Sequence, residues 1–379
     1  MSFFRAEQSA DLLKRGFTRR DLGRLATVIT AGAALPFYNE RALAQLSMVR
    51  DMPADAVKIN ANENPMGPCP EAAEAIHNVV RKGGRYMYEE TFTLKDTLAQ
   101  VCGVKREYVT PYAGSSDPLH RAVLSYCSKE RPFVKADPGY EAGERAARFI
   151  GAKTVNVALR KGTWNHDVKA MLAAHPSPGI VYVCNPNNPT GTGISLTAVE
   201  RIVRRAAHAV VLIDEAYYEF CGVTAMRNLL RSPNLFVSRT FSKVYGMAAM
   251  RMGCLFSQAS NIAYLHKAQS PYSVNSLAAL AAKEAVKDTG YVTHYVTEVL
   301  AARELLCYGL EKLGIPYTPS SANFVLGHFG ARAIEIRDAL RGRAILVRDR
   351  SYEIPGAVRI TVGTREQTQR VLDELSRLW

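Results

Sequence analysis

Short apolar runs alternate with longer amphipathic stretches through the middle of the chain. Residues 180–184, 209–213 and 235–238 are four or five residues long and rich in β-branched or aromatic side chains, and each run precedes a polar loop. Such runs are typical of buried strands. The segment 196–208 has the pattern of a helix between the first two. Strand, helix and strand in this order predict crossover units, and therefore an α/β fold whose parallel sheet has helices on both faces.

The C-terminal part of the chain has a different pattern. It begins with a long helical stretch, continues with strand-like runs and closes with a helix, at residues 275–313, 323–326, 358–362 and 365–378. This mixture predicts a second, smaller α+β domain. We therefore expect an N-terminal arm at 45–70, a large domain at 71–274 and a small domain at 275–379.

Polar motifs follow the predicted strands. They occupy residues 185–191, 214–218 and 240–243. In open parallel sheets, ligands bind beyond the carboxyl ends of the strands. The three motifs therefore predict a site at that edge of the sheet.

Composition and charge narrow the class of ligand. With 379 residues, 47% hydrophobic and 22% charged, the chain has the composition of a soluble globular protein large enough for two domains. The formal charge is +13, but the Lys and Arg residues are scattered and no nucleic-acid recognition motif contains them. We interpret the charge as a bias toward anionic substrates and cofactors, without nucleic acid. The seven cysteines form no CxxC pair, which argues against a zinc site or a disulfide framework and indicates small core residues.

The N-terminus has the three parts of a bacterial twin-arginine export signal. Arg19 and Arg20 precede an apolar run at 25–37, and the small residues of Ala42-Leu43-Ala44 offer a cleavage site. The run is too short to predict a spanning helix. We expect residues 1–44 to be a signal peptide, with a periplasmic mature protein that has no membrane anchor. The alternative is an amphipathic helix in a cytoplasmic protein.

One lysine stands beside groups suited to a phosphate. Ser242-Lys243 follows a predicted strand, and Arg251 comes eight residues later. The hydroxyls of Thr240 and Ser242, together with the Arg251 guanidinium, could hold a phosphate beside the amine. Taken alone, these residues could also be a solvated loop with a surface lysine.

An acidic residue ends the second apolar run. A carboxylate at Asp214 is costly there unless it meets a cation, and a pyridinium N–H would be such a partner. Tyr217 could then reach the phenolic oxygen of the same ring. The alternative is a helix N-cap followed by packed aromatic residues. A lysine nucleophile, a phosphate site and an acid for a pyridine nitrogen are the groups that pyridoxal 5'-phosphate (PLP) chemistry needs.

Two further loops offer donors. Asn188, in the polar turn at 185–191, could donate to the phenolic oxygen, although turn chemistry alone also explains this motif. The segment 113–117 precedes a predicted helix, and the backbone amides of Ser115 and Ser116 would suit a phosphate. A simple helix cap is the competing interpretation.

Together these motifs resemble the PLP-dependent aminotransferases of fold type I, and among them the histidinol-phosphate aminotransferase branch. The resemblance covers nearly all of residues 55–379. It is strongest at Asn60–Pro65, Arg85-Tyr86, Val183–Gly191, Asp214–Phe220, Arg239–Lys243 with Arg251, and Arg359–Glu366. It implies a large domain with a mostly parallel central sheet between helices, a smaller α+β C-terminal domain, and PLP as the cofactor.

The resemblance also implies roles for individual residues toward the cofactor. Lys243 would bind PLP covalently and move a proton, and Asp214 would pair with the pyridine nitrogen. The phenolic oxygen would be met by Asn188 and Tyr217, the phosphate by Ser115, Ser116, Ser242 and Arg251 with Thr240 beside them, and the ring by a stacked Tyr140.

Substrate and partner roles follow in the same way. Arg359 matches the arginine that binds the anionic group of the substrate, with Arg348 as a helper and Asn62 nearby. Tyr86 matches a tyrosine that reaches the cofactor phosphate of the neighbouring subunit, which implies a homodimer with shared active sites. The sequence departs from the family at Gly143, where a second tyrosine is usual, and at Met87, where proline is usual. Both positions are expected beside the substrate.

The expected reaction is a ping-pong transamination. The donor would be histidinol phosphate or an aromatic or other amino acid, and the acceptor 2-oxoglutarate or a similar oxo acid. A decarboxylase or racemase of the same fold, and a binding protein without catalysis, are the alternatives.

Overall fold

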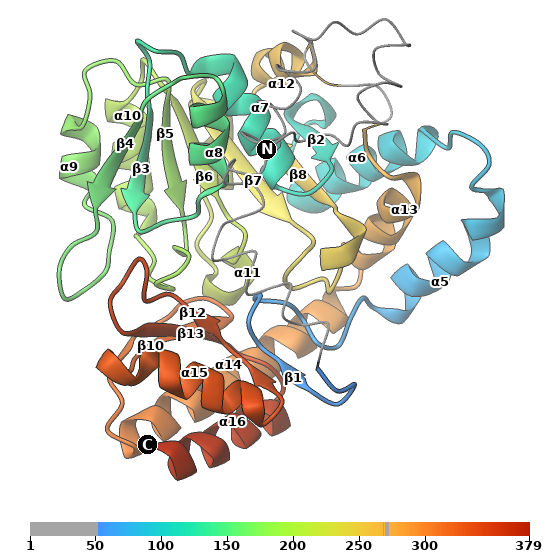
Figure 1. The fold of residues 1–379 in the computed structure, drawn as a ribbon. Coiled ribbons are helices and arrows are strands. Elements are labelled where there is room, and N and C mark those ends of the chain that lie inside the picture. The colour runs from blue at the N-terminus through green and yellow to red at the C-terminus, as the bar shows by residue number, and fades with distance from the viewer. Residues whose placement is uncertain (1–51, 268, 270–272) are drawn as a thin grey trace, which may run out of the picture. The chain divides into compact units, whose positions relative to one another are not determined.

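The computed structural model describes residues 52–267, 269 and 273–379, so the predicted signal peptide at 1–44 lies outside the described residues. Residues 57–379 form one unit, which is built around separate hydrophobic cores (Figure 1). Among the described residues, no helix is both long and apolar enough to cross a membrane.

A seven-stranded sheet forms the centre of the large domain. Its order is β2-β8-β7-β6-β5-β3-β4. The strands are β2 (Val109–Tyr112), β3 (Phe133–Asp137), β4 (Thr154–Ala158), β5 (Ile180–Cys184), β6 (Val210–Asp214), β7 (Leu235–Thr240) and β8 (Gly253–Phe256). The strands from β4 to β7 are parallel, whereas β8 is antiparallel to both of its neighbours. The predicted α/β fold with a mostly parallel sheet is therefore confirmed.

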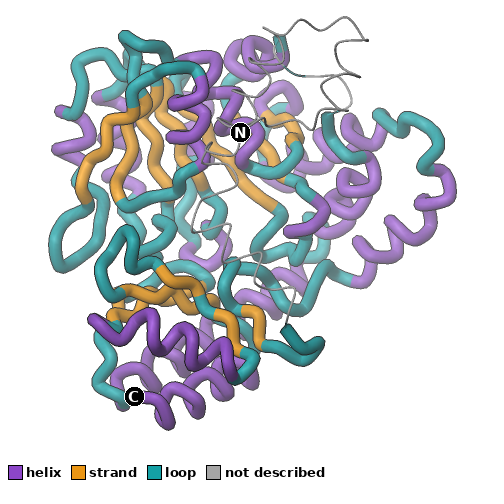
Figure 2. Tube along the Cα trace, viewed as in Figure 1, coloured by secondary structure: helices purple, strands orange, loops and turns teal. Residues whose placement is uncertain are grey.

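Helices cover both faces of this sheet (Figure 2). Along β5, Val181 and Val183 join one core while Ile180 and Tyr182 join the other, because successive side chains of a strand point to opposite faces. The first core is covered by α5 (Pro70–Val79), α6 (Glu89–Cys102), α9 (Val168–Ala173), α10 (Leu196–Arg205) and α13 (Ser276–Ala285). The second is covered by α7 (Ser116–Tyr126), α8 (Ala142–Phe149) and α12 (Ala259–His266).

The small domain is a four-stranded antiparallel sheet of order β12-β13-β10-β9 with helices beside it. Its elements are α14 (Thr289–Lys312), β9 (Tyr317–Thr318), β10 (Phe324–His328), α15 (Ala333–Gly342), β12 (Arg348–Asp349), β13 (Ala357–Thr361) and α16 (Arg365–Leu378). Short helices elsewhere are α11 (Tyr218–Cys221) and the 3-10 turns Val80–Lys82, Arg106–Tyr108, Met226–Arg231, Ala248–Met250 and Gly330–Arg332.

Two boundaries differ from the sequence prediction. The helical stretch 275–313 is two helices, because Asp288 accepts a hydrogen bond from the Tyr291 amide at 2.8 Å and caps α14. The first of the two, α13, packs into the large-domain core through residues such as Ala279 and Ala282. The change from the large-domain core to the small-domain core therefore falls after Val286 and not at residue 275.

The segment predicted as an arm is partly a strand of the C-terminal layer. β1 (Val57–Lys58) pairs in parallel with β11 (Ile345–Leu346). The chain then follows β13, where the Thr361 amide donates to the Ile59 carbonyl at 3.0 Å. This pairing fixes the position of the residues that come next, which form one wall of the candidate site.

Candidate active site

The predicted polar motifs meet at the carboxyl edge of the large sheet. β5, β6 and β7 are parallel neighbours, and they end at Cys184, Asp214 and Thr240. The loops that follow them therefore leave the sheet from the same edge. The segment after β1 and strand β13 of the small domain provide the facing wall.

Lys243 lies in the loop after β7. Its Nζ donates a hydrogen bond to the Ala61 carbonyl oxygen at 3.1 Å. Burial, followed by the positive charge of Arg359, lowers the pKa of this amine to about 8. A lysine with such a pKa is partly neutral near physiological pH and can act as a nucleophile or a base.

Asp214 is a buried acid at the end of β6, with 3% of its surface exposed. Tyr182 donates from its hydroxyl to Oδ2 at 2.8 Å, and the Ala216 amide donates to Oδ1 at 3.2 Å. Within the described part of the chain, no lysine or arginine forms an ion pair with it, and burial raises its pKa to about 6. The N-cap interpretation is wrong, because α11 is preceded by Tyr217 at its N-cap. Asp214 is therefore a carboxylate placed to receive a cation.

Groups suited to an anion lie at the start of α7. Ser115 occupies the N-cap position but makes no side-chain capping bond, so its hydroxyl is not used by the helix. Arg251 donates from Nη1 to Ser242 Oγ at 3.3 Å. At Gly114, with φ +84°, a Cβ atom would fall 2.6 Å from Arg251 Nη2, so only glycine allows this approach. Helix amides, hydroxyls and a guanidinium thus converge as a phosphate would require.

The predicted neighbours of these groups are in place. The Ser116 and Tyr140 hydroxyls are hydrogen-bonded at 3.0 Å, which holds the tyrosine beside the start of α7. Thr240 Oγ1 accepts from the Ser242 amide at 3.1 Å and so shapes the turn that leads to the lysine.

The facing wall brings four more predicted residues together. Asn62 donates from Nδ2 to the Tyr217 hydroxyl at 3.0 Å. Arg359 donates from Nη1 to Asn188 Oδ1 at 2.5 Å and from Nη2 to the Asn60 carbonyl at 3.0 Å. The Asn188 amide nitrogen is left for another acceptor, as its predicted role needs.

Arg348 and Arg359 are direct cross-strand partners on β12 and β13. They are 7% and 5% exposed, and Arg350, which the sequence analysis missed, is 2% exposed. Nε and Nη1 of Arg348 and Nε of Arg359 are buried without a hydrogen-bond partner among the described residues. Burial, followed by the charge of Arg350, lowers the pKa of Arg359 to about 9. Like charges opposed across a sheet destabilise it, so this cluster favours a bound anion.

The sequence contained a signal for Arg350 and for Tyr182. Arg350 stands two residues after Arg348, and Tyr182 stands two residues before the end of β5, next to the strand that carries Asp214. Residues two apart on an extended chain share a face. That spacing alone places both beside predicted site residues.

Two predictions fall outside this cluster. Tyr86, which precedes α6, is 80% exposed, and its predicted role in a neighbouring subunit stays a prediction. Gly143 was expected beside the substrate, but the structure places it in α8 against the ring of Phe133, where a Cβ atom would clash. A tyrosine does not fit at this position, because β3 and α8 pack too closely.

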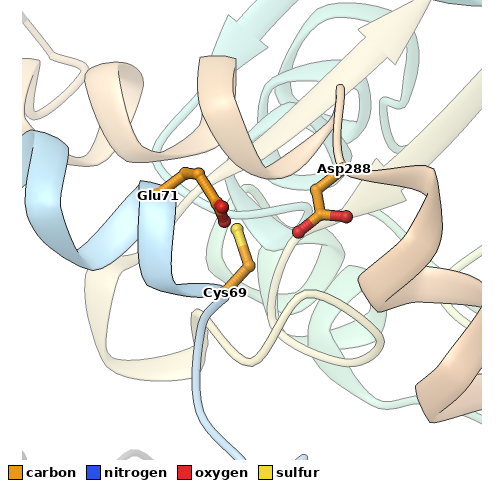
Figure 3. Close-up of side chains that lie close together, drawn as sticks. All are labelled: Cys69, Glu71 and Asp288. Atoms are coloured by element: carbon orange, nitrogen blue, oxygen red, sulfur yellow. The ribbon is translucent and has the colours of Figure 1, made fainter.

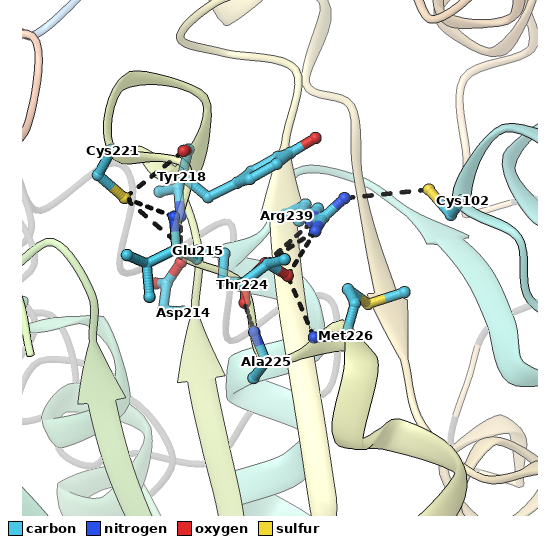
Figure 4. Close-up of polar contacts among 11 residues, drawn as sticks. Cys102, Asp214, Glu215, Tyr218, Cys221, Thr224, Ala225, Met226 and Arg239 are labelled. Carbon is cyan, nitrogen blue, oxygen red and sulfur yellow. Dashed lines mark hydrogen bonds and ion pairs between the residues drawn. The ribbon is translucent and has the colours of Figure 1, made fainter. Parts of the chain in front are cut away.

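Glu215, the residue after Asp214, belongs to a different network (Figure 4). It accepts from the Ala225 amide at 2.6 Å, from Thr224 Oγ1 at 2.9 Å and from Arg239 Nε at 3.0 Å. Arg239 also donates to Thr224 at 2.8 Å, and its guanidinium lies 3.6 Å from the centre of the Tyr218 ring. The oxygens of Glu215 are therefore satisfied within the protein.

Cys69, Glu71 and Asp288 form a third group, with potential ligand atoms within 4.8 Å of one another (Figure 3). Burial raises the pKa of the Cys69 thiol, which opposes the thiolate form that binds metals. Glu71 lies in the first turn of α5 and Asp288 caps α14, so helix ends account for both carboxylates.

The residues present fit PLP. An amine with a pKa near 8, an acid with no cationic partner in the described chain and an anion cradle lie at one edge of one sheet. These are the attachment point, the pyridine partner and the phosphate site that the cofactor needs.

Comparison with known proteins supports this interpretation. The family described as aminotransferase class I and II matches residues 54–375. A histidinol-phosphate aminotransferase 2 of Pseudomonas fluorescens is 32% identical over 351 residues, covering 90% of this chain and 94% of the relative. The histidinol-phosphate aminotransferase of Symbiobacterium thermophilum is 34% identical, covering 85% and 90%.

Solved structures have the same fold. A putative histidinol-phosphate aminotransferase from Erwinia carotovora superposes with a TM-score of 0.81 at 29% identity, covering 85% of this chain and 96% of that one. The histidinol-phosphate aminotransferase of Sinorhizobium meliloti, solved with PLP, has a TM-score of 0.79 at 23% identity, covering 86% and 92%.

Proposed function

Because the chain belongs to the class I and II aminotransferase family and is a PLP-dependent transaminase, we propose that its amino donor is histidinol phosphate and its acceptor 2-oxoglutarate. The observation that carries this proposal is the buried arginine cluster of Arg348, Arg350 and Arg359. Nε and Nη1 of Arg348 and Nε of Arg359 lack hydrogen-bond partners among the described residues, and these donors match the oxygens of a phosphate ester. The names of the relatives support the same donor.

Bound PLP supplies an electron sink for the negative charge left when the donor loses its α-proton. Asp214 favours a protonated pyridine nitrogen, since its buried carboxylate needs a cation. Asn188 and Tyr217 would donate to the phenolic oxygen. Lys243 would be the base that takes the α-proton, and its lowered pKa suits this task near neutral pH.

The remaining predicted residues hold the cofactor. The phosphate would be held by Ser115, Ser116, Thr240, Ser242 and Arg251. Tyr140 would lie against the ring, in a position fixed by its hydrogen bond to Ser116. Asn62 orders the facing wall through its bond to Tyr217.

A donor screen tests the proposal. Purified holoenzyme should consume histidinol phosphate only when 2-oxoglutarate is present, and with a higher kcat/KM than phenylalanine, tyrosine or aspartate. Lys243→Ala should abolish both turnover and the visible absorbance of the bound cofactor. Preference for an amino acid would overturn the donor, and release of CO2 would replace transamination with decarboxylation.

We further propose a homodimer in which Tyr86 completes the site of the other subunit. The exposed aromatic side chains Tyr86, Tyr88 and Phe92 lie close in sequence around the start of α6, and such a patch favours a partner surface. Mixing inactive Lys243→Ala with Tyr86→Ala subunits should restore activity, because a hybrid then contains one intact site. No recovery after subunit exchange, verified by differently tagged subunits, would contradict a shared site.

We also propose export through the twin-arginine route, on the basis of residues 1–44. Replacing Arg19 and Arg20 with Lys should trap uncleaved protein in the cytoplasm, whereas the unchanged protein should be cleaved and periplasmic. Cytoplasmic, uncleaved protein in both cases would overturn export.

A further inference from the structure

A basic cavity is lined by residues of α9, α10 and the loops that precede these two helices. Its volume is about 480 Å³, and the residues that line it include Arg160, His166, Thr197, Arg201 and Arg204. None of the described residues that line it is acidic. The adjoining hollows are lined by Arg205 and Lys169 among others, which extends the positive surface.

The cavity lies at the N-terminus of α10. Ser195 caps this ten-residue helix by accepting from the Ala198 amide at 3.3 Å, and Ser195, Thr197 and Ala198 all line the cavity. The free amides and the dipole at a helix N-terminus attract anions. The arginine side chains therefore add to a field that already favours negative charge.

His166 gives an independent indication of a ligand. It is only 3% exposed, and neither of its ring nitrogens has a hydrogen-bond partner among the described residues. Burial lowers its pKa to about 4, so the ring is neutral and has one unsatisfied donor and one unsatisfied acceptor in the wall of the cavity. A buried polar group without a partner is costly, so a bound group that satisfies it would be stabilised.

We propose that this cavity binds a small phosphate-bearing anion, as a site separate from the active site. Arg201 and Arg204 stand three residues apart on α10, so their guanidinium groups lie on neighbouring positions of one helix face. Two planar guanidinium groups at this spacing suit the oxygens of a phosphate. Arg160 also lines the cavity, and its Nε lies 3.7 Å from Asp167, so it is partly neutralised.

The cavity wall is connected to both sides of the active site. Trp164, two residues before His166, stacks on the His328 ring of β10 at 6.1 Å between centroids and 18° between planes. In the same strand, Leu326 is the direct partner of Arg359. The anion therefore contacts a loop that touches the small-domain sheet which carries the substrate arginine.

The second connection runs through the loop after β5. The Trp164 carbonyl accepts from Thr192 Oγ1 at 2.6 Å, and the Thr192 carbonyl accepts from the Asn187 amide at 2.8 Å. Asn187 precedes Asn188, which contacts Arg359. Occupancy of the cavity is thus expected to alter the surroundings of Trp164.

Tryptophan emission provides the test, because the chain has only two tryptophans, Trp164 and Trp379. Trp379→Phe holoenzyme would be titrated with inorganic pyrophosphate at constant ionic strength. We expect a saturable change in emission and a higher Tm. Arg201→Gln with Arg204→Gln should weaken binding at least about tenfold, since each substitution removes a charge-assisted hydrogen bond to the phosphate.

Three controls decide the outcome. Arg148→Gln with Arg377→Gln removes the same charge from exposed positions on α8 and α16, and should leave the dissociation constant unchanged. His166→Leu should weaken binding, and Arg348→Gln, in the active site, should not. Failure to saturate, equal affinity in the Arg201/Arg204 variant and the control variant, or loss of the response in Arg348→Gln would overturn the proposal. The readout does not depend on turnover, so it also stands apart from the choice of donor.

Discussion

Asp214 and Glu215 are consecutive, acidic and almost completely buried, at 3% and 1% exposure. They point to opposite sides of the chain because the strand backbone alternates. Glu215 meets Arg239, Thr224 and a backbone amide, whereas Asp214 meets one hydroxyl and one amide and no cation in the described chain. The Glu215 carboxylate is satisfied by the fold, and the Asp214 carboxylate needs a cofactor. The difference shows which of two similar buried acids belongs to the chemistry.

The largest expected effect follows from removing the charge of Asp214. Asp214→Asn keeps the shape of the side chain but loses the carboxylate that favours a protonated pyridine nitrogen. We expect kcat to fall on the order of 100- to 1000-fold, the range for lost electrostatic groups in active sites. Unfolding of the apoenzyme, followed by circular dichroism, should show no loss of stability. A kcat within threefold of the unchanged enzyme would remove Asp214 from the mechanism.

The matching change at the neighbouring acid is Glu215→Gln, which leaves Arg239 buried without its charged partner. Breaking a buried ion pair from one side costs about 3–5 kcal/mol of the free energy of unfolding. Turnover per folded molecule should stay close to that of the unchanged enzyme. Denaturant titration and kcat, measured on the same preparations, separate the two effects. Equal loss of turnover in both variants would erase the distinction between the two acids.

The pH dependence of the apoenzyme sharpens the comparison. The pKa of Asp214 is raised from 3.8 to about 6, so between about pH 4 and 6 the folded state keeps a proton that the unfolded chain releases. The free energy of unfolding therefore falls as pH rises through this window, by about 3 kcal/mol in total, because the pKa is raised by about two. Apo Asp214→Asn lacks this slope, so the difference between the two apoproteins isolates it. Adding PLP should remove the difference, because a pyridinium stabilises the carboxylate.

The smallest effects come from single hydroxyls. Tyr182→Phe removes the donor at 2.8 Å from Asp214, and kcat should fall about tenfold, the value of one hydrogen bond to a charged group. Thr224→Val removes a donor at 2.9 Å from Glu215, and should cost about 1–3 kcal/mol of stability with kcat unchanged. A loss of kcat in Thr224→Val, with a loss of stability alone in Tyr182→Phe, would contradict the catalytic role of Asp214 and the structural role of Glu215.

Much of the fold could be predicted because its strands are short, apolar and fully buried. The run 180–184 is β5 without any shift, and 209–213 is displaced by one residue from β6. The break at Asp288 was missed because apolar residues continue on both sides of it, although an aspartate before a helix is a capping signal. The pairing of β1 with β11 could not be predicted, since two-residue strands have no periodicity.

The site followed from the same logic, because neighbouring parallel strands must end at one edge. Lys243, Asp214 and Asn188 were predictable for this reason, because each lies at the end of its own strand or in the loop that follows it. The Ala61 carbonyl that contacts Lys243 was not, because every residue has a carbonyl and only the tertiary fold selects one. The predicted contact of Tyr86 lies in another subunit, so it is neither a confirmed nor a missed contact of this chain.

The strand β1 determines how far the chain can be shortened. Residues 59–62 contact Thr361, Arg359, Lys243 and Tyr217 in turn, although they precede the large domain. A chain that starts at Val57 retains all of these contacts and should retain the site. A chain that starts at Glu63 loses only six residues more, but it lacks the wall that joins the substrate arginine to the lysine. A proteolytic cut before Val57 would therefore be harmless, whereas a cut between Asn62 and Glu63 would open the active site.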